Sequence, residues 1–300
     1  MNSPIVFFAY NRPQHTRDAL LSLSVAKYAS DTEFYIYCDG PKSADEALAV
    51  EEVRRICRHT SGFLKTTVVC RERNIGLAAN VIDGVGTVIA KHGRAIVVED
   101  DLIVSPSFIA YMNAALDFYE GKNVFSISGY MPRISISPDY PYSTCLISRN
   151  ASWGWATWKE CWQKVDWEVT DFDSFITSKS STKSFNKAGN DLTMMLLKQK
   201  QGLINSWSVR FCYAGFKAGW PTVYPVNSLV SNNGVDGSGT NMRRSTRYST
   251  DITDAVDLAH FAPADHFDAR IAKNFRQFYN VSWLRWLINF FKIKAYVYRR

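Results

Sequence analysis

Several signatures of common enzyme and metal-binding classes are missing from this 300-residue chain. No segment matches G-x-G-x-x-G or Walker A, which argues against a dinucleotide-dependent dehydrogenase and against a phosphate-loop NTPase. The six cysteines form no C-x-x-C pair, so we expect reduced core residues in a cytoplasmic protein rather than a zinc site or a disulfide framework. No apolar run is long enough for a signal peptide or a membrane span.

Acidic residues are missing from the end of the chain. The last one is Asp268, and eight basic residues follow it. Subtracting these eight from the net charge of +7 leaves residues 1–268 at −1. A protein that reads nucleic acid spreads its basic residues over the binding face of its folded domain. The distribution therefore argues against nucleic acid as a partner.

The basic end of the chain, residues 275–300, is also rich in aromatic residues. Its apolar side chains recur at helical spacing on one side, at Trp283, Trp286, Leu287, Phe290 and Val297. Arg285, Asn289 and Lys292 are predicted to turn away from that side. An amphipathic cationic helix of this kind suits peripheral contact with an anionic membrane. The alternative is a packed C-terminal helix with its aromatic residues in the core.

Apolar runs alternate with helix-like segments along the first half of the chain. The predicted strands are Pro4–Ala9, Glu33–Cys38, Lys65–Cys70, Ala95–Glu99 and Val124–Ile127. The predicted helices are Gln14–Lys27, Ala44–His59, Ala78–Lys91 and Ser105–Tyr119. This alternation predicts an α/β fold with a parallel sheet, whose ligands gather at the loops that follow the strands.

One of these loops is unusually acidic. The run Ala-Ile-Val-Val that opens residues 95–102 ends in Glu99, Asp100 and Asp101. Three adjacent carboxylates repel one another unless a cation or hydroxyl donors stand beside them. A divalent cation held by one or two carboxylates, with phosphate oxygens as its other ligands, is typical of a nucleoside diphosphate site. A solvated acidic turn is the alternative.

Four segments together resemble a known family. They are Phe-Ala-Tyr-Asn-Arg-Pro (8–13), Cys-Asp-Gly (38–40), Arg-Asn-Ile-Gly-Leu (73–77) and Val-Val-Glu-Asp-Asp-Leu (97–102). Their order is similar to the nucleotide-sugar-binding half of GT-A fold glycosyltransferases, and most of all to bacterial sugar transferases related to the N-acetylglucosaminyltransferase I family. The resemblance continues through residues 153–158 and 205–207 to 225–241.

The resemblance implies a GT-A-like Rossmann-type mixed sheet, mostly parallel and flanked by helices. Residues 1–130 would form the nucleotide-sugar-binding half of one domain and residues 131–250 its acceptor and catalytic half. Residues 251–300 would add the basic aromatic segment. The function implied is metal-dependent transfer of a hexose or N-acetylhexosamine from a nucleoside diphosphate sugar to a glycan or lipid-linked acceptor. The favoured donor is a UDP-sugar, and the expected process is bacterial surface polysaccharide synthesis.

The resemblance also implies roles for individual residues of the donor half. Asp101 would coordinate Mn²⁺ or Mg²⁺, while Asp100 and Glu99 would accept hydrogen bonds from hydroxyls of the ribose or the donor sugar. Asp39 would accept a hydrogen bond from the imide N–H of the nucleobase, with Arg12 stacking or pairing nearby. Asp39 in an ordinary Asp-Gly turn is the alternative.

Other polar residues of these loops are candidates for the nucleotide site. Asn11 belongs to the loop after the first strand, and Asn74, Gly76 and Asn80 fit a loop that turns into a helix beneath the nucleotide. An Asn-x-Gly turn without contact to a ligand is the alternative for that loop.

The acceptor half contains a cluster of tryptophans. Trp155, Trp158 and Trp162 have the spacing i, i+3, i+7, which predicts one helical face buried in the core. Trp153 and Trp155 precede or open that helix, so we expect them to contact the sugar, because an exposed indole suits the apolar face of a pyranose.

The motifs do not identify a catalytic base. An inverting transferase needs a group that takes the proton of the acceptor hydroxyl. The related family supplies an aspartate from the region that matches residues 204–208, where this chain has no acid. Asp191 and Asp236 are the candidates, in that order, and Asp171 and Asp173 are also available. A simple turn residue is the alternative for Asp236, because three glycines flank it. A nucleotidyltransferase or a non-catalytic carbohydrate- or nucleotide-binding module would be the alternative function.

Overall fold

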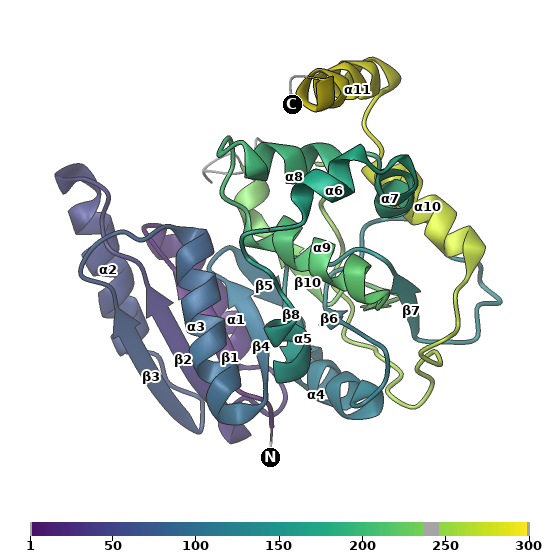
Figure 1. The fold of residues 1–300 in the computed structure, drawn as a ribbon. Coiled ribbons are helices and arrows are strands. Elements are labelled where there is room, and N and C mark those ends of the chain that lie inside the picture. Colours follow the sequence, from purple (N-terminus) through teal and green to yellow (C-terminus); the bar gives the residue numbers. More distant parts are fainter. Residues whose placement is uncertain (1, 237–245, 299–300) are drawn as a thin grey trace.

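An eight-stranded mixed sheet forms the centre of the computed structural model, which describes residues 2–236 and 246–298 (Figure 1). Its order is β3 (Lys65–Cys70), β2 (Glu33–Cys38), β1 (Ile5–Ala9), β4 (Arg94–Glu99), β8 (Trp155–Trp158), β6 (Ser126–Ser128), β9 (Thr222–Pro225) and β7 (Thr144–Ile147). Strands β8 and β7 run antiparallel to their neighbours, and the other described pairings are parallel. The predicted mostly parallel mixed sheet is confirmed.

The first half of the chain builds the sheet by helical crossovers. Helices α1 (Pro13–Ser24), α2 (Ala47–Arg58) and α3 (Leu77–His92) connect β1 to β2, β2 to β3 and β3 to β4. Residues of β1 and most of those of β4 are buried, as expected for strands covered on both faces. The chain moves outward from β1 to β3 and then returns to place β4 on the other side of β1. The carboxyl ends of β1 and β4 therefore flank a topological switch point, where open α/β sheets bind ligands.

The second half extends the sheet and adds helices around it. They are α4 (Phe108–Tyr119), α5 (Lys159–Gln163), α6 (Phe172–Thr177), α7 (Lys179–Phe185), α8 (Leu192–Lys200) and α9 (Trp207–Ala218). Short 3₁₀ helices span Ala29–Asp31 (η1), Ala44–Glu46 (η2), Asn186–Ala188 (η3) and Asn233–Asp236 (η4). The sheet crosses the predicted boundary at residue 130, since β6 pairs with β8.

A two-stranded antiparallel ribbon links the two halves beside the switch point. It pairs β5 (Leu102–Val104) with β10 (Val230–Asn232). Strand β5 directly follows the acidic loop, and η4 directly follows β10. Pairing of the two strands therefore places η4 beside that loop. The N–H of Asn233 donates a hydrogen bond of 2.8 Å to the carbonyl oxygen of Asp101.

The tryptophan cluster is buried, but not as one helical face. Residues 155–158 form strand β8, and the helix α5 begins only at Lys159. The ring of Trp155 stacks on Trp207 at 4.8 Å and on Trp162 at 6.0 Å between centroids. The prediction of a core position was correct and the prediction of a helix was wrong, because the spacing spans a strand and the helix that follows it.

The end of the chain forms two helices, α10 (Ala269–Tyr279) and α11 (Trp283–Tyr298). Figure 1 shows α11 at the top of the molecule, and its neighbours are α6 and α8. Across the described ranges, each helix is too short or too polar to cross a membrane.

Candidate functional site

The switch point brings together side chains from the loops after β1 and β4. The guanidinium of Arg12 donates through Nη2 to Asp100 Oδ1 at 2.5 Å and to Asp101 Oδ2 at 3.0 Å. The backbone N–H of Tyr10 donates to the other oxygen of Asp100 at 3.2 Å. Three predicted site residues therefore meet. Arg12 contacts the carboxylates themselves, which differs from its predicted place beside the nucleobase.

Two polar atoms at this junction have no hydrogen-bond partner among the described residues. They are Asp101 Oδ1 and Arg12 Nη1, and both are buried. A buried polar atom left unpaired costs about 1–3 kcal/mol, so such a pair marks a place for a ligand. The arrangement offers one acceptor for a cation and one donor for an anion, side by side.

Gly234 of η4 closes this junction from the acceptor half. A Cβ at Gly234 would overlap Asp101 Oδ2 and would lie 3.0 Å from Arg12 Nη1. Its N–H donates to the side chain of Asn232 at 2.6 Å, which holds the turn in place. The sequence showed only an Asn-Gly turn here, and the reason for the glycine is this close approach to Asp101.

The carboxylate oxygen available at the junction fits a divalent cation that binds together with a phosphate-containing molecule. No three His, Cys, Asp or Glu side chains of the described residues are grouped closely enough to hold a metal ion alone. Asp101 offers one free oxygen, and hard cations such as Mn²⁺ and Mg²⁺ complete their coordination with phosphate oxygens in such cases. A cation held by Asp101 would supply positive charge for a diphosphate.

The electrostatics of the acidic loop also favour a cationic partner. Burial, with the charges of Asp101 and Asp100 adding to it, raises the pKa of Glu99 to about 8. Burial likewise raises the pKa of Asp100, although Arg12 opposes the shift. Ionising all three carboxyl groups of the loop at once is therefore unfavourable, and a bound cation would lower that free-energy cost.

Asp39 joins the loops that follow β2 and β3. Its Oδ1 accepts hydrogen bonds of 2.9 Å from the N–H groups of Gly40 and Ile75, and its Oδ2 accepts one of 3.0 Å from Gly76. The side chain of Asn74 ties the same loops together through the carbonyl oxygen of Gly40, at 2.8 Å. Asp39, Asn74 and Gly76 are thus brought together, and they shape the loops.

Asn11 and Asn80 have different surroundings. The amide of Asn11 donates to Glu46 Oε1 at 3.1 Å, and the hydroxyl of Tyr10 donates to the same carboxylate. Glu46 was not predicted because it lies outside the loops that directly follow the strands, and Tyr10 was named only as part of the motif at residues 8–13. The residue type of Glu46 alone gives no signal.

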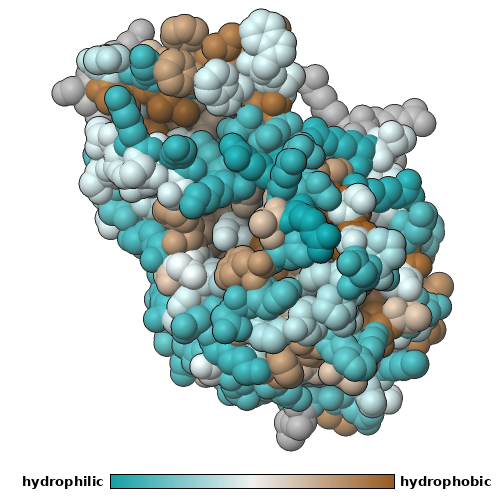
Figure 2. Space-filling model, turned by 90° about the vertical axis from the view of Figure 1, so that its right-hand side faces the viewer, coloured by the Kyte–Doolittle hydropathy of each residue, from teal (hydrophilic) through white to brown (hydrophobic). Residues whose placement is uncertain are grey.

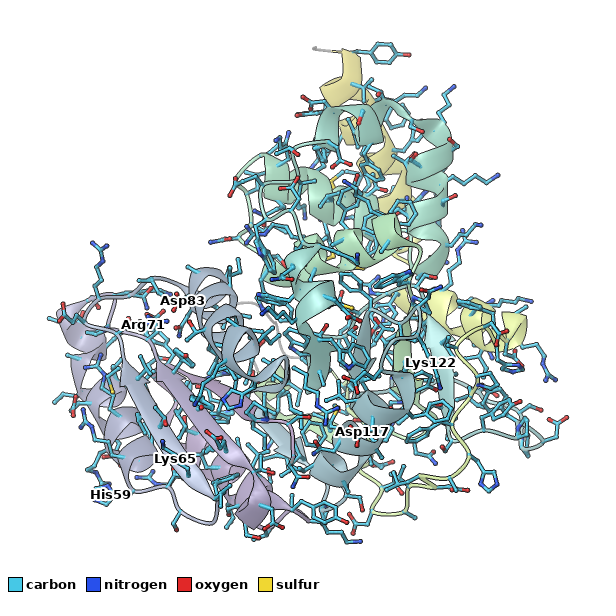
Figure 3. All side chains as sticks on the ribbon, turned by 60° about the horizontal axis from the view of Figure 1, so that its bottom comes forward. His59, Lys65, Arg71, Asp83, Asp117 and Lys122 are labelled. Atoms are coloured by element: carbon cyan, nitrogen blue, oxygen red, sulfur yellow. The ribbon has the colours of Figure 1, made fainter. Side chains whose placement is uncertain are left out.

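The prediction for Asn80 was wrong. Its side chain is 2% exposed, and its Oδ1 accepts a hydrogen bond of 3.1 Å from Nε of Arg71. Arg71 follows β3 and pairs with Asp83 of α3 (Figure 3). Asn80 therefore braces the start of α3 from inside, and its side chain is not available to a nucleotide.

The two tryptophans predicted to contact the sugar differ in exposure. Trp155 is 1% exposed and covered by other aromatic rings, so its predicted sugar contact was wrong. Trp153 is half-buried, and its ring lies edge-on to Tyr130 at 4.6 Å and to Tyr248 at 5.8 Å. Trp153 keeps a partly accessible indole.

The two predicted bases also differ. Both oxygens of Asp191 accept hydrogen bonds from Arg149, at 2.8 and 2.9 Å, and both side chains are largely buried. This bidentate pair leaves little of Asp191 for an acceptor hydroxyl. The backbone of Asp236 ends η4, two residues after Gly234, and its side chain lies outside the described residues.

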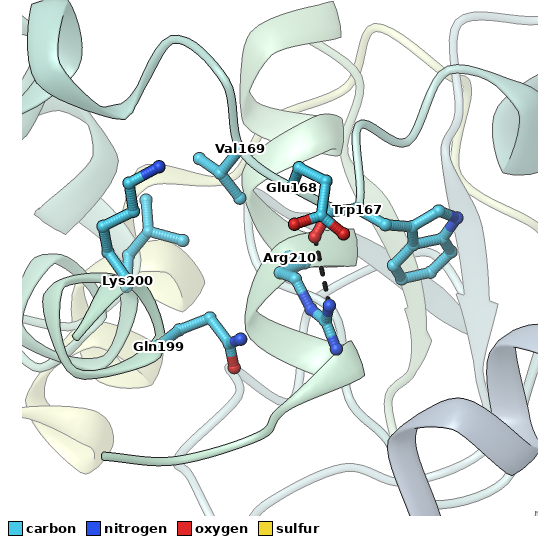
Figure 4. Close-up of a pocket in the computed structure, with 7 residues that line it drawn as sticks. Trp167, Glu168, Val169, Gln199, Lys200 and Arg210 are labelled. Carbon is cyan, nitrogen blue, oxygen red and sulfur yellow. Dashed lines mark hydrogen bonds between the residues drawn. The ribbon is translucent and has the colours of Figure 1, made fainter. Parts of the chain in front are cut away.

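Arg210, which contacts the stretch 204–208 where an acid was expected, lines a small cavity of about 180 Å³ (Figure 4). Arg210 donates to the carbonyl oxygen of Trp167, to Asn205 Oδ1 and to the carbonyl oxygen of Ser206, at 3.0–3.1 Å. Glu168 is the acidic residue among its described lining residues. An arginine network thus organises this stretch.

Comparisons with known proteins give weak matches. No family model and no curated protein matches the chain. Among solved structures, a mannosyltransferase from Pyrobaculum calidifontis in complex with GDP-Man and Mn²⁺ has 12% identity and a TM-score of 0.41, over 73% of this chain and 75% of that one. An active-site mutant of LgtC has 13% identity and a TM-score of 0.38, over 91% and 94%. A cytidylyltransferase from Leptospira borgpetersenii has 11% identity and a TM-score of 0.35, over 55% and 64%.

Matches with such low identities and TM-scores assign no activity to this chain. The resemblance to the N-acetylglucosaminyltransferase I family remains a prediction from the motifs. The junction of Arg12, Asp100 and Asp101 is therefore the feature that bears on function.

Proposed function

We propose that this chain is a metal-dependent glycosyltransferase of the GT-A type. It would transfer a sugar from a nucleoside diphosphate sugar to a glycan or glycolipid acceptor in the synthesis of bacterial surface polysaccharide. The observation that carries the proposal is the junction at the switch point, where Asp101 and Arg12 each present a buried atom without a partner among the described residues.

A diphosphate bound with a divalent cation satisfies both of these atoms. Its oxygens would accept a hydrogen bond from Arg12 Nη1, while Asp101 Oδ1 would coordinate Mn²⁺ or Mg²⁺. Departure of the diphosphate leaves negative charge at this point, and preorganised positive groups stabilise such charge more effectively than water does. Arg12 is preorganised in this way because Asp100 fixes its guanidinium.

The neighbouring loops would hold the nucleoside. A carboxylate offers about four lone-pair sites, and backbone N–H groups fill three of those on Asp39. The remaining site suits the imide N–H of uracil, which supports a UDP-sugar as the donor. Glu99 and Asp100 would accept hydrogen bonds from ribose or sugar hydroxyls.

We assign the proton acceptor to Asp236 in preference to Asp191. The turn that contains Asp236 starts at Asn233, which is hydrogen-bonded to Asp101. Asp191 is instead committed to Arg149. Trp153, with its partly accessible ring, is our candidate for contact with a pyranose.

The test is donor turnover with a panel of UDP- and GDP-sugars, with and without Mn²⁺. We expect metal-dependent release of the nucleoside diphosphate, which Asp101→Asn abolishes. The control is Asp117→Asn, which breaks an aspartate–arginine pair with Arg94 at the opposite end of β4 and should retain full turnover. Pyrophosphate release from a nucleoside triphosphate would instead indicate a nucleotidyltransferase. Metal-dependent binding without turnover of any donor would indicate a binding module.

A further inference from the structure

Helix α11 presents an apolar face to solvent. Trp283, Leu284 and Phe291 are 73%, 57% and 63% exposed, and Ile288 and Phe290 are also exposed. Figure 2 shows hydrophobic side chains gathered at the top of the molecule, where Figure 1 places α11. Large apolar side chains grouped on one surface are uncommon in monomeric proteins and mark an interaction site.

The opposite face of α11 attaches the helix to the protein. Asn289 is 7% exposed, and Ile293 and Tyr296 pack against the core, with the ring of Tyr296 at 5.9 Å from that of Phe172. Asn289 was predicted to turn away from the apolar side of the helix, and it does so by facing the protein. The alternative of a packed helix with its aromatic residues in the core holds in part, because α11 packs on the protein while Trp283 and Phe291 are exposed. The helix is anchored by one face and leaves the larger aromatic residues free.

Basic residues are frequent in the sequence of α11 and before it, and those on the helix itself are exposed. Eight follow Asp268 in the sequence and no acid does. The segment 179–200, which forms α7 and α8, adds five lysines and one acid, Asp191, whose charge is paired with Arg149. On α11 itself, the ammonium of Lys294 lies 4.7 Å from the ring centre of Phe290, so a cationic group stands beside the apolar face.

We propose that α11 docks this protein on the surface of an anionic lipid bilayer. Exposed indole and phenyl rings would enter the interface between headgroups and acyl chains, while the lysines and arginines would face the lipid phosphates. The helix would lie along the surface, in keeping with its length. A second copy of the chain is a poorer occupant, because two segments that each carry eight basic residues and no acid repel one another. This surface is independent of the proposed sugar transfer, although it would bring a lipid-linked acceptor to the enzyme.

The test is sedimentation of the full-length protein with phosphatidylcholine vesicles that do or do not contain phosphatidylglycerol. The variant is Trp283→Ser with Phe291→Ser, and the matched control is Leu48→Ser with Leu203→Ser, which removes two exposed apolar side chains outside α11. We expect the wild type and the control to bind anionic vesicles at low salt, with binding weakened by high salt. The α11 variant should bind about tenfold more weakly at an unchanged melting temperature.

Three results would overturn the proposal. One is the absence of binding by the wild type to anionic vesicles at low salt, and another is equal binding by the α11 variant. The third is a dimer in the absence of lipid that the α11 variant alone dissociates, together with a failure to bind vesicles. That result would make the face an interface between two copies of the chain.

Discussion

Loss of one partner from the pair formed by Asp191 and Arg149 should be strongly destabilising. Its side chains are 20% and 11% exposed, and the guanidinium lies 4.0 Å from the ring centre of Tyr279. Removing one partner of a buried ion pair costs about 3–5 kcal/mol, because the other charge remains buried without compensation. An asparagine keeps one acceptor oxygen, so we expect Asp191→Asn to lose about 3 kcal/mol. For a chain of 300 residues that corresponds to a fall in melting temperature of roughly 5 °C, since the unfolding entropy is about 2.1 cal/mol/K per residue.

Thermal unfolding of Asp191→Asn beside Asp251→Asn measures this loss. Asp251 also makes two hydrogen bonds to one guanidinium, that of Arg133, at 3.0 Å each, but its side chain is 94% exposed. Solvent screens that pair, so Asp251→Asn should leave the melting temperature unchanged. An Asp191→Asn variant that melts with the wild type and loses about a hundredfold in transfer would refute the structural role and restore Asp191 as the base.

Three further predictions concern other parts of the structure. Gly234→Ala should weaken Mn²⁺-dependent nucleotide binding about tenfold in calorimetry, because its Cβ would displace Asp101; unchanged affinity would contradict the close approach. Asp39→Asn should lower the free energy of unfolding, measured in urea, by about 1–3 kcal/mol, because an amide NH₂ would face backbone N–H donors. A smaller loss would mean that the hydrogen bonds of Asp39 to these loops contribute little to stability. Burial lowers the pKa of His92 below its ordinary value of 6.5, so the unfolded chain takes up the proton first and the protein loses stability as pH falls through 6.5. His92→Gln should flatten that slope, and an unchanged slope would place the titration elsewhere.

The parallel part of the sheet was predictable from local pattern. Strands Glu33–Cys38 and Lys65–Cys70 match their predicted bounds, because β-branched and aromatic residues fill both segments between turn residues. Strand β8 was missed because its Trp-Ala-Thr-Trp sequence has no aliphatic run. Its extended conformation comes from pairing with β4 and β6.

The site was partly predictable for a similar reason. Arg12, Asp100 and Asp101 follow β1 and β4, and the loops after parallel strands lie at one edge of the sheet, so their presence at that edge was predictable. The partners of Asp191 and Gly234 lie 42 and 133 residues away in sequence, and no local pattern indicates them. Asn80 shows the same limit, because packing against Arg71 decides which way a side chain in the first turn of α3 points.

Calorimetric titration of UDP into the wild type and into Asp101→Asn, with and without Mn²⁺, tests the central claim most directly. We predict that Mn²⁺ tightens nucleotide binding to the wild type about tenfold or more, and that Asp101→Asn removes this effect while its melting temperature stays unchanged. Nucleotide binding that is equally tight in both proteins, or that does not respond to Mn²⁺ in the wild type, would contradict the assignment of the diphosphate and its cation to the junction of Asp101 and Arg12.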